Sequence, residues 1–357
     1  QINVDGQISA TSGSSSFWGQ IWGGLTASDI NVNREVTING TSKDATITLG
    51  SNAIINNSNL TLKDINIVGS IMGNGTLNID GTVNSTVNVF NSKTLTNDQI
   101  KQQTGLGSNM HGASTDNWKA PNVQASKVNV EQGATLNINR DIDGDGINEP
   151  DHGIVNVGIN SHLNINLKNA QYASRANEQS SSIENANAGI RILDNGTITT
   201  GDSAEVNIHA GHGRAIVIDE PFGGTSDVAN NTSLEGWENG RTGDNSSRAA
   251  SHRTQVVLGD STKMNITGRG GLVLGDTATF VTGDHSIIHI DNQGNGEGLL
   301  LDANSRVEVS PHSQLLMTSD GKNASGYYGG GNYIGMGQSA QFRVEHDATF
   351  RYKVINS

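Results

Sequence analysis

The sequence contains no cysteine, which excludes disulfides, thiolate metal sites and cysteine nucleophiles together. Proline is almost as rare, with 4 residues in a chain of 357, and aromatic residues make up only 4%. No apolar run approaches the roughly 20 residues of a membrane-spanning helix, so no membrane insertion is expected. Hydrophobic residues amount to 33%, which is little for a globular chain of this length. The fold must therefore need few apolar side chains per residue.

The charge balance is one-sided. The chain has 22 Lys and Arg against 35 Asp and Glu, for a formal net charge of −13. A nucleic-acid-binding protein carries a clustered basic surface, so no nucleic-acid partner is expected. Disorder fits poorly, because the apolar residues are regularly placed.

A repeat of short β-branched strands and Gly, Asn and Asp turns is the strongest signal in the chain. One cycle reads Gly-Leu-Val-Leu-Gly over residues 271–275, a second strand over 278–281 and a third over 286–290. A Gly-rich turn follows, and Gly298 opens the cycle again after about 27 residues. This length is in the range in which a coil of three strands closes. We call these the first, second and third strands.

The second and third strands recur at an offset of about eight residues along most of the chain. Within each strand apolar and polar residues alternate, as in Glu-Val-Asn-Ile over residues 205–208, which places every other side chain inside a prism. The sequence predicts an all-β fold, a right-handed parallel β-solenoid (β-helix) with three strands per coil and about a dozen coils. We expect residues 1–16 to be a linker or leader, and residues 17–357 to form a single solenoid domain.

Three intervals between coils are too long and predict loop insertions, near residues 91–122, 168–188 and 219–253. Several first strands are apolar at their outward positions too, which is typical of a sheet covered on both faces. We therefore expect the insertion at 219–253 to fold over the first strands and to form a cleft along its margin. The simpler interpretation is that this loop only covers an apolar stripe.

The candidate binding residues are arginines and aromatic residues on the first strands and in the insertions. They are Arg191, Arg214, Arg269, Trp237, Arg241, Arg248, Arg253, Tyr172 and Arg175. The planar guanidinium binds carboxylates with two hydrogen bonds, so uronic acid or sialic acid groups are natural ligands. An equally weighted alternative is that these arginines pair with nearby aspartates of the chain.

Aspartates recur at the turns, for example Asp202, Asp260 and Asp284 between second and third strands. Asp favours turns because it bonds its own backbone, and this is the main explanation of the pattern. Stacked carboxylates also repel one another, which favours their protonated forms. From this we expect anion binding to strengthen at mildly acidic pH.

A possible metal site is the segment Asp-Ile-Asp-Gly-Asp-Gly, with Asp141, Asp143 and Asp145 as ligands. It resembles the first half of an EF-hand-type calcium loop. The twelfth position is His152 instead of the usual Glu, so Glu149 or Asp151 would have to substitute. Ca²⁺ is a possible ligand, no cofactor is required, and the alternative is a solvated acidic turn.

The predicted coils, a Ser-rich stretch over residues 12–16, the absent cysteine and Asn/Thr/Gly-rich strands occur together. In this combination the chain resembles the ligand-binding region of the serine-rich repeat surface adhesins of lactobacilli. The resemblance implies a secreted, wall-anchored protein at the bacterial surface, with pH-dependent attachment to host mucus and epithelium. It also implies acidic polysaccharides, such as polygalacturonate, and mucin glycans as ligands, and a solenoid similar to pectate lyases. A sorting signal, a signal peptide and long Ser repeats are missing, so we expect an excised, non-enzymatic binding region.

The main alternative is a calcium-dependent polysaccharide lyase of the pectate type, for which Asp194, Asp219 and Arg214 are the best constellation. Such an enzyme needs carboxylates and a base that converge on one exposed sheet face. The outward positions of the first strands are instead mostly apolar. A structural rod, a tail fibre and self-association between bacteria also remain open.

Overall fold

We describe the fold from a computed structural model of the chain. The described residues are 1–9, 29–96, 119–168, 187–192, 195–211, 213–218, 254–268, 270–275, 277–293, 298–301, 304–319, 334–336 and 339–355.

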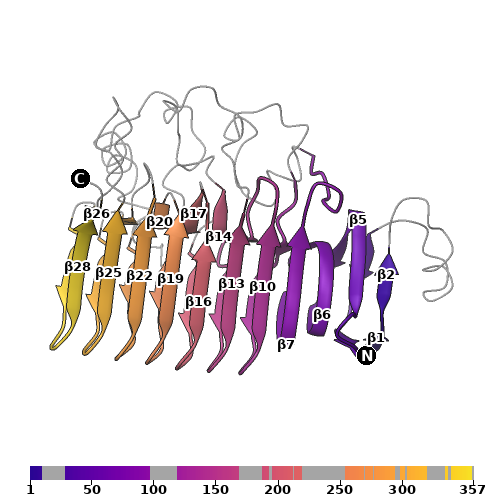
Figure 1. Cartoon of the computed structure of the whole chain (residues 1–357), viewed down its shortest axis with the longest axis horizontal. Helices are drawn as coiled ribbons and strands as arrows, with labels where there is room; N and C mark the ends of the chain where they lie inside the picture. Colours follow the sequence, from indigo (N-terminus) through magenta and orange to yellow (C-terminus); the bar gives the residue numbers. More distant parts are fainter. Residues whose placement is uncertain are drawn as a thin grey trace.

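Within this part, every regular element is a β-strand, and the 28 strands pair in parallel along an elongated body (Figure 1). From β10 onward each strand pairs with the third strand after it, so one coil contributes three strands. The predicted fold class, an all-β parallel solenoid, is confirmed. In the described residues no helix is long and apolar enough to cross a membrane.

The strands form three long sheets, which we name by the order of strands in a coil. The first sheet contains β3 (Ile30–Val32), β8 (Val123–Gln124), β11 (Ile147–Glu149), β14 (Ala188–Ile192), β17 (Arg214–Ile218), β20 (Gly270–Leu274), β23 (Leu299–Leu301) and β26 (Ile334–Met336). The second sheet contains β1 (Ile2–Val4), β4 (Val36–Gly40), β9 (Lys127–Val130), β12 (Ile154–Val157), β15 (Thr197–Thr200), β18 (Gln255–Val257), β21 (Thr279–Val281), β24 (Arg306–Val309) and β27 (Gln341–Val344). The third sheet contains β2 (Gln7–Ser9), β10 (Thr135–Arg140), β13 (His162–Leu167), β16 (Glu205–His209), β19 (Lys263–Gly268), β22 (Ile287–Asn292), β25 (Gln314–Ser319) and β28 (Thr349–Val354).

Three long strands near the N-terminus belong to more than one sheet. They are β5 (Thr46–Asn56), β6 (Asn59–Met72) and β7 (Thr76–Val87). Each continues through a corner where later coils break, with register shifts at Thr48/Ala53 and Lys63/Ile65. Equivalent residues there are only 18 or 20 positions apart, instead of the 27 between β10 and β13. The predicted coil length of about 27 residues therefore holds for later coils but not for these.

One continuous apolar core fills the prism from Val4 to Met317. Alternation in the sequence creates it, because inward residues stack in register on like residues of the next coil. Leu136 and Ile138 of β10, for example, pair with Leu163 and Ile165 of β13, and all four are at most 2% exposed. Each coil thus buries its apolar side chains against its two neighbours.

Candidate functional site

The outer side of the first sheet is as buried as its inner side. Strands β14, β17 and β20 are buried at every position. The outward row runs in register through Gln124, Asn148, Arg191, Val217, Val273 and Leu300, and none of these exceeds 5% exposure. The prediction that these strands are covered on both faces is confirmed. The row changes from polar and charged to apolar along the rod.

A buried ion pair forms the charged part of this row. Arg191 Nε donates to Asp145 Oδ2 at 2.9 Å, with side-chain exposures of 6% and 2%. The same oxygen accepts from Asn148 Nδ2 at 2.9 Å, and Asp145 Oδ1 accepts from the Ala188 N–H at 2.8 Å. For Arg191 the structure thus shows pairing with an aspartate of the chain itself, which was the alternative interpretation from the sequence.

A second arginine, which the sequence did not single out, organises the loop that carries Asp145. Arg140 ends β10, is fully buried, and donates to the backbone oxygens of Ile142, Asp143 and Ala120 at 2.6–3.1 Å. Burial lowers the pKa of Arg140 to about 10, while the nearby carboxylates of Asp145 and Asp143 act in the opposite direction. The guanidinium remains charged at neutral pH and holds the loop carbonyls together.

The three aspartates of this loop have different surroundings. Asp143 Oδ1 accepts from Asn187 Nδ2 at 3.2 Å, Asp145 is engaged as described above, and Asp141 is exposed. Asn187 Oδ1 accepts from the Gly144 N–H at 2.9 Å, which fastens the loop to the next coil. Within the described ranges no three His, Asp or Glu side chains are placed to hold a metal ion. A calcium ion at Asp145 would have to share that carboxylate with Arg191, Asn148 and the Ala188 N–H.

The two substitutes for the missing calcium ligand are also placed elsewhere. Glu149 points into the core and is 0% exposed. Asp151 lies at the surface and pairs with His152 Nδ1 at 2.9 Å. Glu149 is therefore unsuitable as a ligand of this loop, because alternation along β11 directs its carboxyl to the interior.

Arg214 lies at the start of β17, 6% exposed. A Cβ added at Gly270, its register partner in the next coil, would lie 2.8 Å from Arg214 Cγ and 3.2 Å from Nη1. The arginine side chain thus lies along the rod, across Gly270, toward the following coil. Its predicted neighbour Arg269 lies outside the described residues, as do Trp237, Arg241, Arg248, Arg253, Tyr172 and Arg175.

The predicted insertions coincide with the largest intervals in the register. Equivalent asparagines are 53 residues apart between β7 and β10, 43 between β13 and β16, and 58 between β16 and β19. These intervals contain the ranges 91–122, 168–188 and 219–253. The expected cover over the first sheet, residues 219–253, lies outside the described part of the chain.

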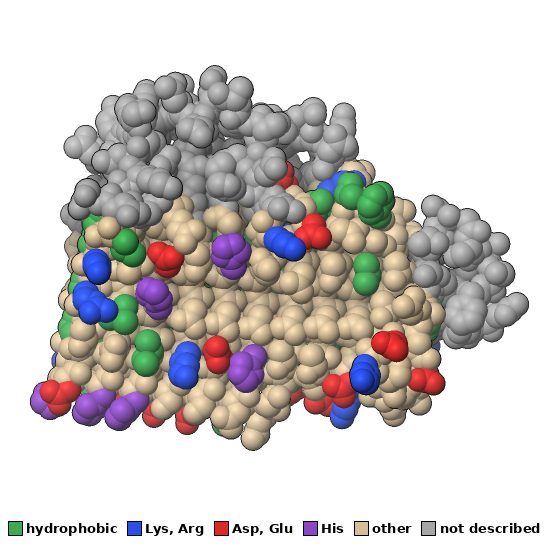
Figure 2. Space-filling model, in the orientation of Figure 1, with side chains coloured by type: hydrophobic (Ala, Val, Ile, Leu, Met, Phe, Trp, Pro, Cys, Tyr) green, Lys and Arg blue, Asp and Glu red, His purple; other side chains and the backbone are tan. Residues whose placement is uncertain are grey.

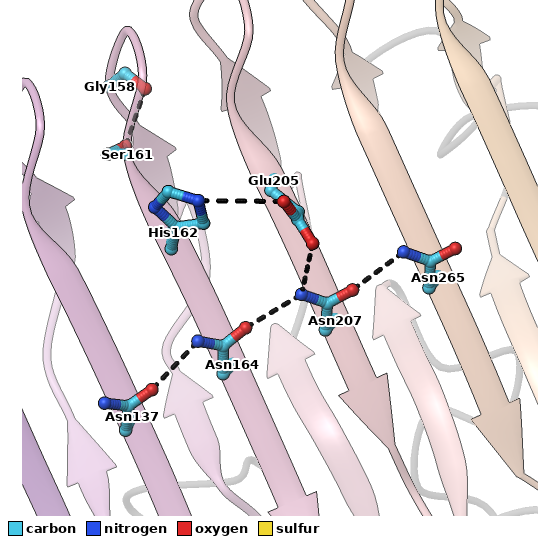
Figure 3. A network of polar contacts seen from close by, with 8 residues as sticks. All are labelled: Asn137, Gly158, Ser161, His162, Asn164, Glu205, Asn207 and Asn265. Carbon is cyan, nitrogen blue, oxygen red and sulfur yellow. Dashed lines mark hydrogen bonds and ion pairs between the residues drawn. The ribbon is translucent and has the colours of Figure 1, made fainter.

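A ladder of asparagine side chains crosses the exposed third sheet (Figure 3). Each amide Nδ2 donates to the residue of the preceding coil, over distances of 2.7–3.3 Å. Its members are Thr46, Asn66, Asn84, Asn137, Asn164, Asn207 and Asn265. Figure 2 shows that the face around it consists mostly of uncharged polar side chains and backbone, with scattered charges. The recurring Asn-Ile pair in these strands was the sequence signal for this ladder.

A second regular feature is the aspartate row at the corner before the third sheet. The carboxylate of Asp202 accepts from the N–H of Asp260, and that of Asp260 accepts from the N–H of Asp284, both at 3.0 Å. Both bonds join a carboxylate to the backbone of the next coil, whereas the turn interpretation predicts a bond to the residue's own turn. Asp194 and Asp219, named for the lyase alternative, lie outside the described residues.

The fold and this site define the class of the molecule as a parallel β-solenoid with a buried polar row on its first sheet. No protein-family model, no curated protein and no solved structure matches the chain. Its function has to be argued from its own residues.

Proposed function

We propose that the chain is the binding region of a bacterial cell-surface adhesin, secreted and anchored to the cell wall. Its ligands are acidic glycans of the mucin or polygalacturonate type, bound more strongly at acidic pH. The proposal rests on one observation, the position of Arg214. A guanidinium held at 6% exposure beside the covered outer side of a sheet is a suitable group for a carboxylate on a polymer chain.

The neighbouring residues refine where such a carboxylate would bind. Arg191 pairs with Asp145, an aspartate of the chain itself. Arg214 lies one coil further along, at the start of the strand that also carries Val217, and its register partner in the following coil is Gly270. An acidic sugar bound at this position would place its carboxylate on the Arg214 guanidinium.

The first test is a titration with polygalacturonate at about pH 4 and pH 7 with calcium present, while ultraviolet absorbance is followed. We expect saturable binding that is tighter at pH 4, without absorbance from unsaturated product. Growing absorbance would instead identify a lyase. Absence of binding at both pH values would reject acidic polysaccharides of this type as ligands.

The second test locates the site. The double variant Arg214→Ala/Arg269→Ala should lose most binding while its circular dichroism remains that of the wild type. The matched control is Arg306→Ala/Arg343→Ala, which removes two exposed arginines that pair with Glu308 and Glu345. Equal binding by both double variants would place the site elsewhere on the rod.

A further inference from the structure

Glu149 is a carboxylic acid inside the apolar column of the solenoid. It is the last residue of β11, and its register partner in the next coil is Ile192. The same interior column continues through Ile218, Leu274 and Leu301, which are all 0% exposed. Glu149 is also 0% exposed, so it takes a place that later coils give to an aliphatic side chain.

The corner that follows Glu149 is shaped around this side chain. A Cβ added at Gly153 would lie 2.5 Å from Glu149 Cβ, 2.6 Å from its Oε2 and 3.0 Å from Ile192 Cγ2. One coil later, Gly196 packs in the same way on Ile192 and Ile218. The carboxyl therefore fills the slot between the core and the corner that an isoleucine fills in the next coil.

No group in the described structure compensates a negative charge at this point. Neither carboxyl oxygen of Glu149 has a hydrogen-bond partner among the described residues. On the facing strand β14 the only ionisable residue, Arg191, lies on the opposite side and pairs with Asp145. Strands β8, β12 and β15 carry none, and Asp151 and His152 at the corner are exposed and paired with each other.

We propose that the protonation state of Glu149 controls whether the corner at 150–153 stays packed on this coil. In its protonated form the side chain behaves as an uncharged core residue, and the corner at 150–153 stays packed against the core. In its ionised form the buried charge has no partner, and the least costly relief is to lift the corner so that water reaches the carboxylate. The inference is independent of any ligand and goes beyond the binding function proposed above.

The direction of the pH dependence follows from burial, which raises the pKa of Glu149 well above its ordinary value of 4.5. Below that value the group is protonated in the folded and unfolded chain alike, so the coil has its full stability. As the pH rises, the unfolded chain releases the proton first, and stability falls until the pH has passed the raised pKa of the folded state. The corner is therefore most stable in acid, and its stability decreases toward alkaline pH.

Hydrogen–deuterium exchange of the full chain between pH 5 and pH 8, corrected for intrinsic exchange rates, tests this. We expect the protection of residues 147–157 to fall by about tenfold or more over that range, which corresponds to about 1.4 kcal/mol or more in the free energy of local opening. Residues 134–140 of the preceding coil provide an internal reference. In Glu149→Gln and Glu149→Leu the protection should be independent of pH.

Glu131→Gln, which neutralises an exposed glutamate at another corner, is the matched control and should keep the pH dependence of the wild type. A wild-type profile without pH dependence would overturn the proposal, and so would a Glu149→Gln profile that still falls like the wild type. If the larger change in Glu149→Leu prevents folding, the near-isosteric Gln variant alone decides.

Discussion

Gly144 shows how closely single residues are fitted around the Arg140 guanidinium. Its φ of +128° lies in the region that favours glycine, and an added Cβ would lie 2.1 Å from Arg140 Nη2. That guanidinium is held by several backbone oxygens and is fully buried, so it has little room to move. The sequence left open a calcium loop or a solvated acidic turn, and the structure shows a loop whose backbone oxygens are bound by a buried arginine.

We predict that Gly144→Ala destabilises the chain by about 1–3 kcal/mol, through backbone strain and overpacking against Arg140. Gly133→Ala is the control, because Gly133 also has a positive φ, +71°, but nothing lies within 4 Å of its added Cβ. Urea unfolding followed by circular dichroism should give the larger loss for Gly144→Ala. Equal losses would show that contact with Arg140 does not matter.

The Asp145–Arg191 pair is the second prediction at the residue scale. Replacing only Arg191 by Met should cost about 3–5 kcal/mol, because it leaves the buried carboxylate of Asp145 without its partner. The double variant Asp145→Asn/Arg191→Met should cost clearly less than the sum of the single changes. The exposed pair Lys63–Asp80, 3.2 Å apart, should show a coupling of only about 0–1 kcal/mol in the same cycle. Additive single changes at Asp145 and Arg191 would refute the pairing.

At the scale of the element, the asparagine ladder joins coils that the chain connects only at their corners. Asn164 donates to Asn137 Oδ1 at 2.8 Å and accepts from Asn207 Nδ2 at 2.9 Å. Both bonds run along the rod, parallel to the backbone bonds of the third sheet (Figure 3). One side chain therefore supports two interfaces between coils.

We predict that Asn164→Ala lowers the free energy of unfolding by about 1–2 kcal/mol, since each of the two hydrogen bonds contributes roughly 0.5–1.5 kcal/mol. Asn139→Ala changes an exposed position on β10 whose side chain makes no hydrogen bond to another described residue, and it should cost less than about 0.5 kcal/mol. Chemical denaturation of the two variants side by side checks the difference. A smaller loss of unfolding free energy at Asn164 than at Asn139 would mean that the ladder contributes little to stability.

Strands were predictable from the sequence because alternation such as Thr-Leu-Asn-Ile is a local pattern with a direct physical cause. The long strands β5–β7 were not, because continuation through a corner depends on register shifts that leave no clear local mark. Pairing of Asp145 with Arg191 could not be predicted either. The two residues are 46 positions apart, and the predicted insertion near residues 168–188 separates them along the chain.

At the scale of the whole molecule, the low apolar content is explained by geometry. A narrow prism needs one inward apolar side chain in two, and a single core runs the length of the rod. Coils interact with their neighbours only, so stability is close to a sum of local terms. The sequence predicted that the first strands are covered on both faces, and it left open whether their arginines bind a ligand or pair with aspartates of the chain. For Arg191 the partner is Asp145.

The direction of the hydrogen bonds also determines how such a rod responds to force. The strands follow one another along the long axis of the molecule (Figure 1). The backbone bonds and the amide ladder that join neighbouring strands therefore run along this axis, and tension between the two ends acts directly against them. A coil of 27 residues advances the folded rod by about 4.8 Å and, once detached and extended, spans about 90 Å. If coils detach one at a time, each detached coil therefore becomes nearly twentyfold longer, and the rod absorbs mechanical work in small steps.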